Sequence, residues 1–323
     1  MKRFYLLVIA IALLSLYALS LGAADVAGVW RYITHPLLDI NSPSHQIIWE
    51  IRAPRIAAAI LVGSCLGIAG VLAQGSTNNP LADPAILGTS AGASVGVLAG
   101  VLLNVVTIGS VGAVIFASIG ALLATLFTFS LARSALQLIT IGIGVSAILT
   151  AIVGLVLSMV TRADARSVSF WSFGSLALVT PRILLILLPV LLVGGFLAWK
   201  VAPSLDLLSL GDDSVRHIGH DAQKIRLRAF AILATLVAVT VSSVGSIAFL
   251  ALAAPHIARY LVGPRNRTLI LYSAAIGALI LLLADSASRA LIPPNELPIG
   301  LLTSLLGAPI LILTLKKGGD VWR

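Results

Sequence analysis

The sequence predicts an all-α membrane protein that forms a single transmembrane domain over residues 1–323. Hydrophobic residues make up 59% of the chain, charged residues only 10%, and the mean hydropathy is +1.08. A soluble globular protein carries about 25% charged residues, so that class is excluded. At roughly 20 residues per crossing, the length allows about ten transmembrane helices and leaves no stretch for a soluble domain.

The first candidate helix is the apolar run 4–24, which follows Lys2 and Arg3. We expect it to be retained as a helix, with a cleaved signal peptide as the alternative because small residues follow it. Further charge-free runs predict five more crossings, since the longest run needs a turn near residues 104–109. These runs are 56–82, 84–132, 134–161 and 183–199.

Residues 200–228 form the most highly charged segment of the chain. The uncharged run 229–258 follows, which is too long for one helix and too short for two full ones. If it crosses once and returns through a short helix, helices at 269–287 and 299–315 complete the bundle. Fourteen of the 21 Lys and Arg residues then lie on the side of both termini. The positive-inside rule places that side, with segment 200–228, in the cytoplasm.

The formal net charge of +9 would suggest a nucleic-acid partner in a soluble protein. Here the basic residues lie in loops beside apolar runs, where they act as topology signals, and we expect no nucleic acid. Cys65 is the single cysteine, so the chain holds no internal disulfide, and it has no His or Cys neighbours that could share a metal ion. No Walker-type phosphate loop and no His-Glu-x-x-His motif occur, so we expect no catalytic residues on this chain.

Small and polar residues inside the apolar runs carry further information. Gly88, Gly92 and Gly96 repeat at a four-residue spacing, which indicates either static helix packing, our preferred interpretation, or a helix that lines a translocation path. Asp285 is the main intramembrane charge, and Arg289 lies four residues later on the same helical face, where the two can pair. An ion-coupled secondary transporter would need more such groups.

Several separated motifs resemble the FecCD/BtuC-type permease family of ABC importers, which take up iron siderophores, haem or cobalamin. They include Ile-Arg-Ala-Pro-Arg at 51–55, Asn-Pro-Leu-Ala-Asp-Pro at 79–84, Leu-Gly-Asp-Asp from 210, Pro-His-Ile-Ala-Arg at 255–259 and Leu-Pro-Ile-Gly at 297–300. The chain departs from the family pattern at Ala248 and Ala251, where glycine is common, and at Val215, where alanine is common.

The resemblance implies a multi-pass permease of the cell inner (plasma) membrane with about ten helices and a pair of short cytoplasmic coupling helices between the sixth and the seventh. Its implied partners are a cytoplasmic ABC ATPase dimer that holds ATP and Mg²⁺, a second permease chain of identical or sister type, and a periplasmic or lipid-anchored substrate-binding protein. This chain itself needs no cofactor. The implied substrate is a ferric siderophore or ferric citrate, with haem and cobalamin as alternatives.

The resemblance also implies roles for individual residues. The ATPase-coupling residues are Asp212, Asp213, Ser214, Arg216 and Gly219. Outward-facing Arg52, Arg55 and Arg289 match positions that dock the binding protein, although Arg55 is equally well explained as a headgroup anchor. Ser134 and Ala135 match the place where the path narrows on the cytoplasmic side. We interpret His256 as a helix-end contact, because no second metal ligand is near it.

Overall fold

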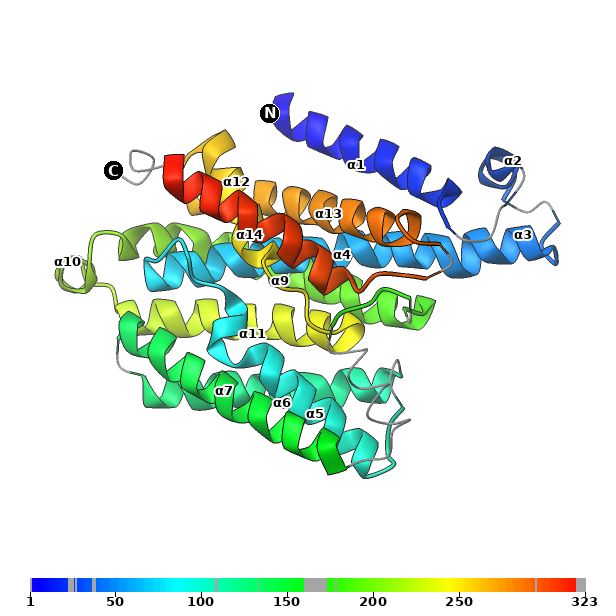
Figure 1. Ribbon diagram of the computed structural model, residues 1–323. Helices are drawn as coiled ribbons and strands as arrows, with labels where there is room; N and C mark the ends of the chain where they lie inside the picture. The colour runs from blue at the N-terminus through cyan, green and yellow to red at the C-terminus, as the bar shows by residue number, and fades with distance from the viewer. Residues whose placement is uncertain are drawn as a thin grey trace.

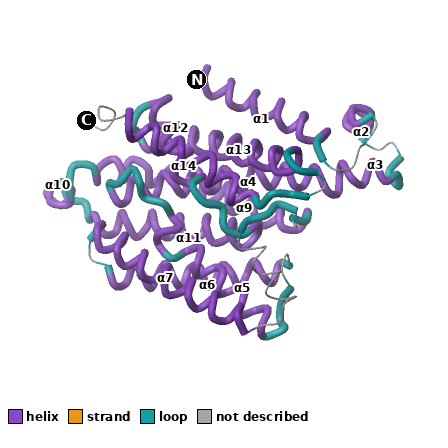
Figure 2. The backbone as a smooth tube through the Cα atoms, viewed as in Figure 1, coloured by secondary structure: helices purple, strands orange, loops and turns teal. Residues whose placement is uncertain are grey.

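The computed structural model describes residues 2–22, 26, 28–36, 39–107, 110–132, 134–159, 173–177, 179–293 and 295–317. These residues form helices joined by loops and turns, without a strand among them (Figure 2). The all-α prediction is therefore confirmed for the described part of the chain.

The long helices pack into one bundle (Figure 1). They are α1 (Lys2–Ser20), α4 (Ala53–Thr77), α5 (Thr89–Leu102), α6 (Val111–Leu131), α7 (Ala135–Met159), α9 (Pro181–Leu208), α11 (Ala222–Val244), α12 (Leu250–Val262), α13 (Asn266–Ala290) and α14 (Ile299–Lys317). Shorter elements are α2 (Val29–Thr34), α3 (Pro43–Gln46), the π-helical turn η1 (Ile47–Arg52), the 3₁₀ turn η2 (Pro84–Leu87) and α10 (Asp212–His217).

Seven of the described helices are long and apolar enough to cross a membrane. They are α1, α4 with the turns that precede it from Pro43, α6, α7, α9, α11 and α13. The apolar helices α5 and α12 and the apolar part of α14 are shorter. The chain is thus an integral membrane protein, and the count of ten crossings stays a prediction.

Helix α4 lies at the centre of the bundle, with α13, α11, α9 and α12 packed around it (Figure 1). Of its apolar stretch 83% is buried, against 72% for α11 and 67% for α13. The corresponding values for α1, α7 and α9 are 6%, 17% and 22%. These three helices therefore expose apolar side chains, as helices in contact with lipid do.

Glycines let α4 and α13 touch through their backbones. A Cβ atom added at Gly63 would overlap the carbonyl group of Gly277, and one added at Gly67 would overlap the carbonyl group of Ser273. Gly277 in turn faces the carbonyl oxygen of Gly63. Because lipid is as apolar as the helix surface, such close contact between small residues is a main source of helix association in membranes.

The composition of the charged segment 200–228 predicts a polar interruption between two helices, but most of this segment is helical. Helix α9 continues to Leu208 and α11 begins at Ala222, so much of the charge sits on helix ends. The Lys200 ammonium lies 4.8 Å from the centroid of the Phe196 ring, and Asp206 accepts hydrogen bonds from the backbone and side-chain N–H groups of Asn266, at 3.0 and 2.8 Å. Such contacts let charged side chains extend helices beyond the apolar span.

This extension also changes the predicted pair of short coupling helices. Between α9 and α11 the structure has one short helix, α10, which is 6 residues long. Between α10 and α11 the described residues form no second short helix, since α11 begins at Ala222 and continues without interruption into the bundle.

The beginning of α1, the end of α14 and α10 lie at the same end of the bundle, which we call the α10 end (Figure 1). Helix α11 leads away from it and α12 returns toward it, as the run 229–258 predicted. The Arg3 side chain donates to the carbonyl oxygen of Leu261 at 2.6 Å, which ties α1 to the end of α12. Which side of the membrane the α10 end faces remains a prediction.

The contact between α4 and α13 predicts that Gly277→Ala destabilises the protein, because the new methyl group forces the two backbones apart. Overpacking of this kind costs about 1–3 kcal/mol. Gly144→Ala is the matched control, since nothing lies within 4 Å of a Cβ atom there, and alanine favours the helix. Thermal unfolding in detergent should show a lower midpoint for the first variant alone, and equal midpoints would contradict the close contact.

Candidate functional site

The predicted coupling residues gather on α10 and the turn that follows it. Asp212, Asp213, Ser214 and Arg216 are exposed there. Gly219 has a φ of 82°, in the left-handed region that favours glycine, and so turns the chain toward α11. The segment therefore presents charged side chains outside the bundle.

A bidentate ion pair fastens α10 to α11. Arg226 Nη1 donates to Oδ2 of Asp212 at 2.8 Å, and Nη2 donates to Oδ1 at 2.6 Å. Hydrogen bonds from the Arg226 guanidinium lower the pKa of Asp212 below its ordinary value. Arg226 is not among the coupling residues predicted from the sequence, although an arginine at the start of a long apolar helix is a signal for such a role.

Asp221 forms the cap at the start of α11. Its Oδ1 accepts hydrogen bonds from the backbone N–H groups of Lys224 at 3.1 Å and Gln223 at 2.9 Å. These backbone hydrogen bonds, first that of Lys224, lower the pKa of the Asp221 carboxyl group. The cap fixes where α11 begins and thereby the position of Arg226 in its second turn.

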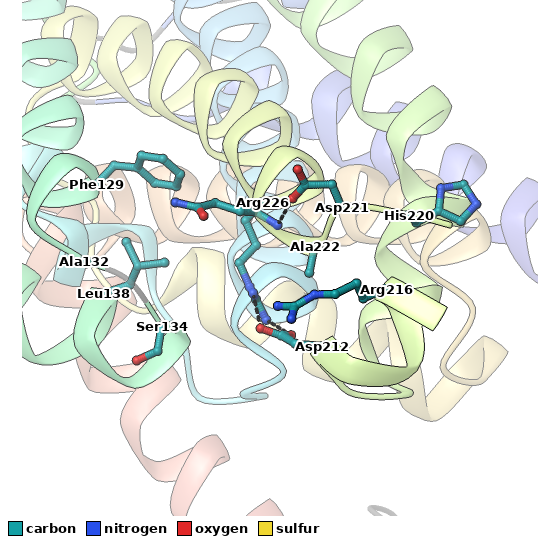
Figure 3. A pocket seen from close by; sticks show the side chains of 11 residues that line it. Phe129, Ala132, Ser134, Leu138, Asp212, Arg216, His220, Asp221, Ala222 and Arg226 are labelled. Carbon is teal, nitrogen blue, oxygen red and sulfur yellow. Dashed lines mark hydrogen bonds and ion pairs between the residues drawn. The ribbon is translucent and has the colours of Figure 1, made fainter. Parts of the chain in front are cut away.

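A cavity of about 470 Å³ lies between α10, the start of α11 and the connection from α6 to α7 (Figure 3). Asp212, Arg216 and Arg226 line one side, and Ser134 and Leu138 line the other. Two predictions made separately, a coupling segment and a gate at Ser134, thus meet at one cavity. The Ser134 hydroxyl accepts a hydrogen bond from the backbone N–H of Gln137 at 3.3 Å, which caps α7.

Ala135 is the first residue of α7, next to Ser134, and its side chain lies outside the described part of the structure. The structure therefore gives only the backbone position of this predicted gate residue.

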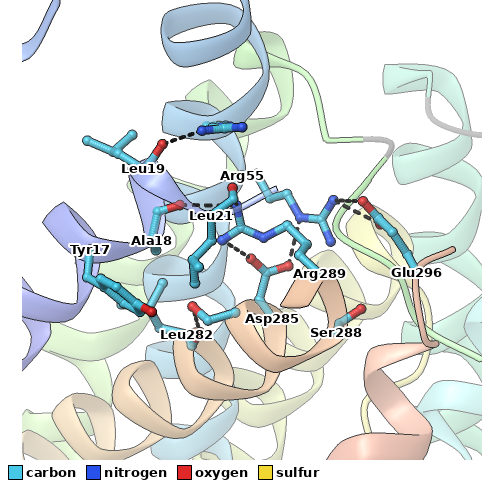
Figure 4. A network of polar contacts seen from close by, with 12 residues as sticks. Tyr17, Ala18, Leu19, Leu21, Arg55, Leu282, Asp285, Ser288, Arg289 and Glu296 are labelled. Carbon is cyan, nitrogen blue, oxygen red and sulfur yellow. Dashed lines mark hydrogen bonds and ion pairs between the residues drawn. The ribbon is translucent and has the colours of Figure 1, made fainter. Parts of the chain in front are cut away.

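At the opposite end of the bundle, the buried side chains of Arg55, Asp285 and Arg289 form a charged network with the partly exposed Glu296 (Figure 4). Arg55 Nε donates to Asp285 Oδ1 at 2.7 Å, and Arg55 Nη1 donates to the two carboxylate oxygens of Glu296 at 2.8 and 2.9 Å. Arg289 Nη2 lies 3.0 Å from Asp285 Oδ2, so the predicted pairing of these residues is confirmed. We call this side of the protein the Arg55 end.

The network extends to the last turn of α1. Arg289 Nη1 donates to the carbonyl oxygens of Ala18 and Leu21, at 3.2 and 3.0 Å, and Arg52 Nη1 donates to that of Leu19 at 2.7 Å. The last carbonyl groups of a helix have no partner within it, so arginines satisfy them here. α1, whose apolar surface is mostly turned outward, is thereby held at the Arg55 end.

Arg52, Arg55 and Arg289 are buried in the structure and do not form an exposed rim, so their role in docking a binding protein stays a prediction. Their exposed fractions are only 4%, 5% and 6%. Carboxylates on α13 and on the loop before α14, and the carbonyl groups of α1, draw the guanidinium groups inward. These arginines therefore join helices instead of forming an exposed rim, and a binding protein would have to meet other residues or another conformation.

The glycine ladder packs α5 against α6. A Cβ atom at Gly96 would overlap the carbonyl group of Phe116, and one at Gly92 would meet both Gly120 and the side chain of Ala124. Gly88 has a φ of 82° at the start of α5. These contacts agree with static packing, and a role of the ladder in the translocation path remains a prediction.

The same segment carries the spacing Gly-x-Ser-x-Gly twice, at 88–92 and 92–96. That spacing indicates a hydrolase nucleophile only where a strand turns sharply into a helix. Here both copies run along α5 from its cap, so they belong to the packing face. His256 lies half-buried in α12, and no group of three His, Cys, Asp or Glu residues that could hold a metal ion occurs among the described residues.

Comparison with known proteins gives consistent matches. The model of the FecCD transport family matches residues 7–317. The iron(3+)-hydroxamate import system permease protein FhuB of Bacillus subtilis is 36% identical over 276 residues, which cover 84% of this chain and 71% of that protein. The hemin transport system permease protein HmuU of Yersinia pestis is 33% identical over 289 residues, which cover 87% and 85%.

A solved structure is similar over nearly its whole length. It is a metal-chelate type ABC transporter in an inward-facing conformation, with 28% sequence identity and a TM-score of 0.88. The match covers 98% of this chain and 99% of that one.

The buried network predicts that Asp285→Asn strongly destabilises the protein, because Arg55 and Arg289 lose their buried carboxylate. Breaking a buried pair costs about 3–5 kcal/mol. Glu296→Gln is the control, since the Glu296 side chain is 37% exposed and partly exposed pairs contribute about 0–1 kcal/mol. Unfolding midpoints in detergent should rank the variants in this order, and equal midpoints would show that the network is not held by Asp285.

The lowered pKa of Asp212 predicts how the attachment of α10 depends on pH. The ion pair contributes fully above the ordinary aspartate pKa of about 3.9 and is lost only as the pH falls through the lower value of the folded protein. Hydrogen exchange of the α10 amides, corrected for intrinsic rates, should therefore stay constant from about pH 8 to pH 5. Asp212→Asn should accelerate it throughout. A change in protection within this pH range would contradict the assignment of the attachment to this ion pair.

Proposed function

Because the chain belongs to the FecCD transport family and is an ABC importer permease of the metal-chelate kind, we propose that it carries an iron(III) chelate into the cytoplasm. The chelate is of the ferric siderophore or ferric citrate type. The observation that carries this proposal is the near-complete match to an inward-facing metal-chelate transporter, with a TM-score of 0.88. Haem and cobalamin are the alternatives, since permeases for iron-hydroxamate, hemin and vitamin B12 are similar to this chain at 36%, 33% and 32% identity.

The proposed complex contains two permease chains, identical or sister, and an ABC ATPase dimer on the cytoplasmic side. It lies in the inner (plasma) membrane with both termini in the cytoplasm, and a periplasmic or lipid-anchored protein delivers the chelate. The beginning of α1 and the end of α14 lie at the same end of the bundle as the charged helix α10, which supports this orientation. The sequence has no Walker-type phosphate loop, so ATP is hydrolysed by the partner.

In the proposed cycle the ATPase dimer moves α10 of each permease chain as it closes on ATP. The permease then alternates between outward-open and inward-open forms, because contacts at α10 differ between the two states. The exposed acidic and basic side chains of α10 suit a polar contact with a soluble partner.

The burial of Asp285 weighs against the rival class, an ion-coupled secondary transporter. Asp285 is fully buried, and both of its oxygens face arginines. A carboxylate neutralised in this way is not free to bind and release a proton or a cation during transport. Energy from a partner ATPase fits the chain better.

Reconstitution in vesicles tests the proposal. The tagged permease is purified with the proteins that accompany it, and uptake of radioactive iron as a ferric trihydroxamate is measured with and without ATP. We expect an ATPase subunit to co-purify and uptake to require ATP. Haem and cobalamin serve as competing substrates. Purification of the permease alone, with ion-driven flux in ATP-free vesicles, would contradict the proposal.

A further inference from the structure

Helix α10 has few attachments to the rest of the protein. Val215 is its one buried side chain, with an exposed fraction of 0%. Asp212 supplies its ion pair, to Arg226 of α11, with N–O distances of 2.6 and 2.8 Å. Apart from the short chain connections to α9 and α11, displacement of α10 therefore reaches the rest of the protein mainly through these two residues, one apolar and one charged.

The same arginine also holds the end of α4. Arg226 Nε donates to the carbonyl oxygen of Ser76 at 3.0 Å. Ser76 lies in the last turn of α4, where carbonyl groups have no partner within the helix. Only 8% of Arg226 is exposed. One guanidinium group thus binds the exposed helix α10 and the most deeply buried helix of the bundle at the same time.

Helix α4 is placed to carry a displacement through the protein. Helix α4 lies at the centre of the bundle. Arg55, in the first turn of α4, belongs to the charged network at the opposite end of the bundle from α10. Next to the end of α4, Asn78 donates to the carbonyl oxygen of Leu208 at 2.6 Å, which joins α4 to the end of α9. Movement at Ser76 would therefore reach α9 and the Arg55 end through continuous contacts.

Free space lies beside this linkage. The cavity of about 470 Å³ separates Arg226 and α10 from Ser134 at the start of α7 (Figure 3). A side chain packed on all sides could transmit force only by deforming its neighbours, whereas Arg226 has room on one side into which α10 and the guanidinium group can shift.

We propose that Arg226 is a positioning residue that transmits displacement of α10 to α4, through simultaneous contacts with Asp212 and Ser76. The inference rests on the proposed function, because it assumes that the ATPase acts on α10. It adds a specific route from that contact into the membrane-embedded core. The route requires both contacts of Arg226, so charge alone at this position is not sufficient.

The test compares uptake with ATP hydrolysis in the same vesicles, using the whole complex and radioactive ferric trihydroxamate. Three variants are compared. Arg226→Met removes the guanidinium group, and Arg226→Lys has an ammonium group that cannot reproduce the bidentate pair together with the Ser76 bond. Asp212→Asn keeps the Ser76 bond. Arg228→Met is the matched control, because Arg228 is exposed on the same helix and forms no ion pair among the described residues.

We expect the iron taken up per ATP hydrolysed to fall by about tenfold in Arg226→Met and Arg226→Lys, within the usual range of coupling between linked sites. Asp212→Asn should lower the ratio as well, and Arg228→Met should leave it unchanged. A residue with a merely structural role would lower uptake and hydrolysis together, so an unchanged ratio would overturn the inference.

If Arg226→Met does not assemble with the ATPase, Asp212→Asn and Arg226→Lys decide the question by the same ratio. Failure of the proposed function is distinguishable, because it would show in the unmodified complex as uptake without ATP. Failure of the Arg226 linkage would show only in the variants, as normal coupling in an assembled complex.

Discussion

Where α4 and α13 cross, Gly63 and Gly67 face Gly277 and Ser273 with no side chain between the two backbones. Helices in lipid gain little hydrophobic free energy by associating, so their stability depends on such close packing and on interhelical polar contacts. This crossing fixes α4 at the centre, and α9, α11 and α12 then pack around it. The positions of both polar clusters follow from it, since each cluster holds one end of α4.

The two ends of α4 are held by different chemistry. At the Arg55 end, buried guanidinium groups pair with Asp285 and also bind the last carbonyl groups of α1. Taking charges out of water is costly, and that cost is offset only where partners surround them, as they do here. At the α10 end, Arg226 is buried but its partner Asp212 remains partly exposed. Because of this difference, we infer that the Arg55 end of α4 is held rigidly, whereas the α10 end can shift when a partner contacts it.

The sequence predicted the fold class and most helices, because apolar runs and charge asymmetry are local properties of the chain. It also predicted the pairing of Asp285 with Arg289, which lie one turn apart on one helix. It did not predict that α9 extends to Leu208, because the contacts that stabilise the charged extension involve α13. The burial of Arg52 and Arg289 depends on where α1 ends in space, which no sequence spacing reveals. The two partners of Arg226 are separated from it by 14 and 150 residues.

The central claim is that α10 is where energy from ATP hydrolysis enters this permease. A photo-crosslinking residue in place of Ser214, which is exposed on α10, tests it most directly in membranes that contain the assembled complex. The control carries the same group in place of Arg31, which is exposed on α2 at the opposite end of the bundle (Figure 1). We expect crosslinks to the ATPase from position 214 and none from position 31. Crosslinks to the ATPase from position 31, or none from position 214, would contradict it.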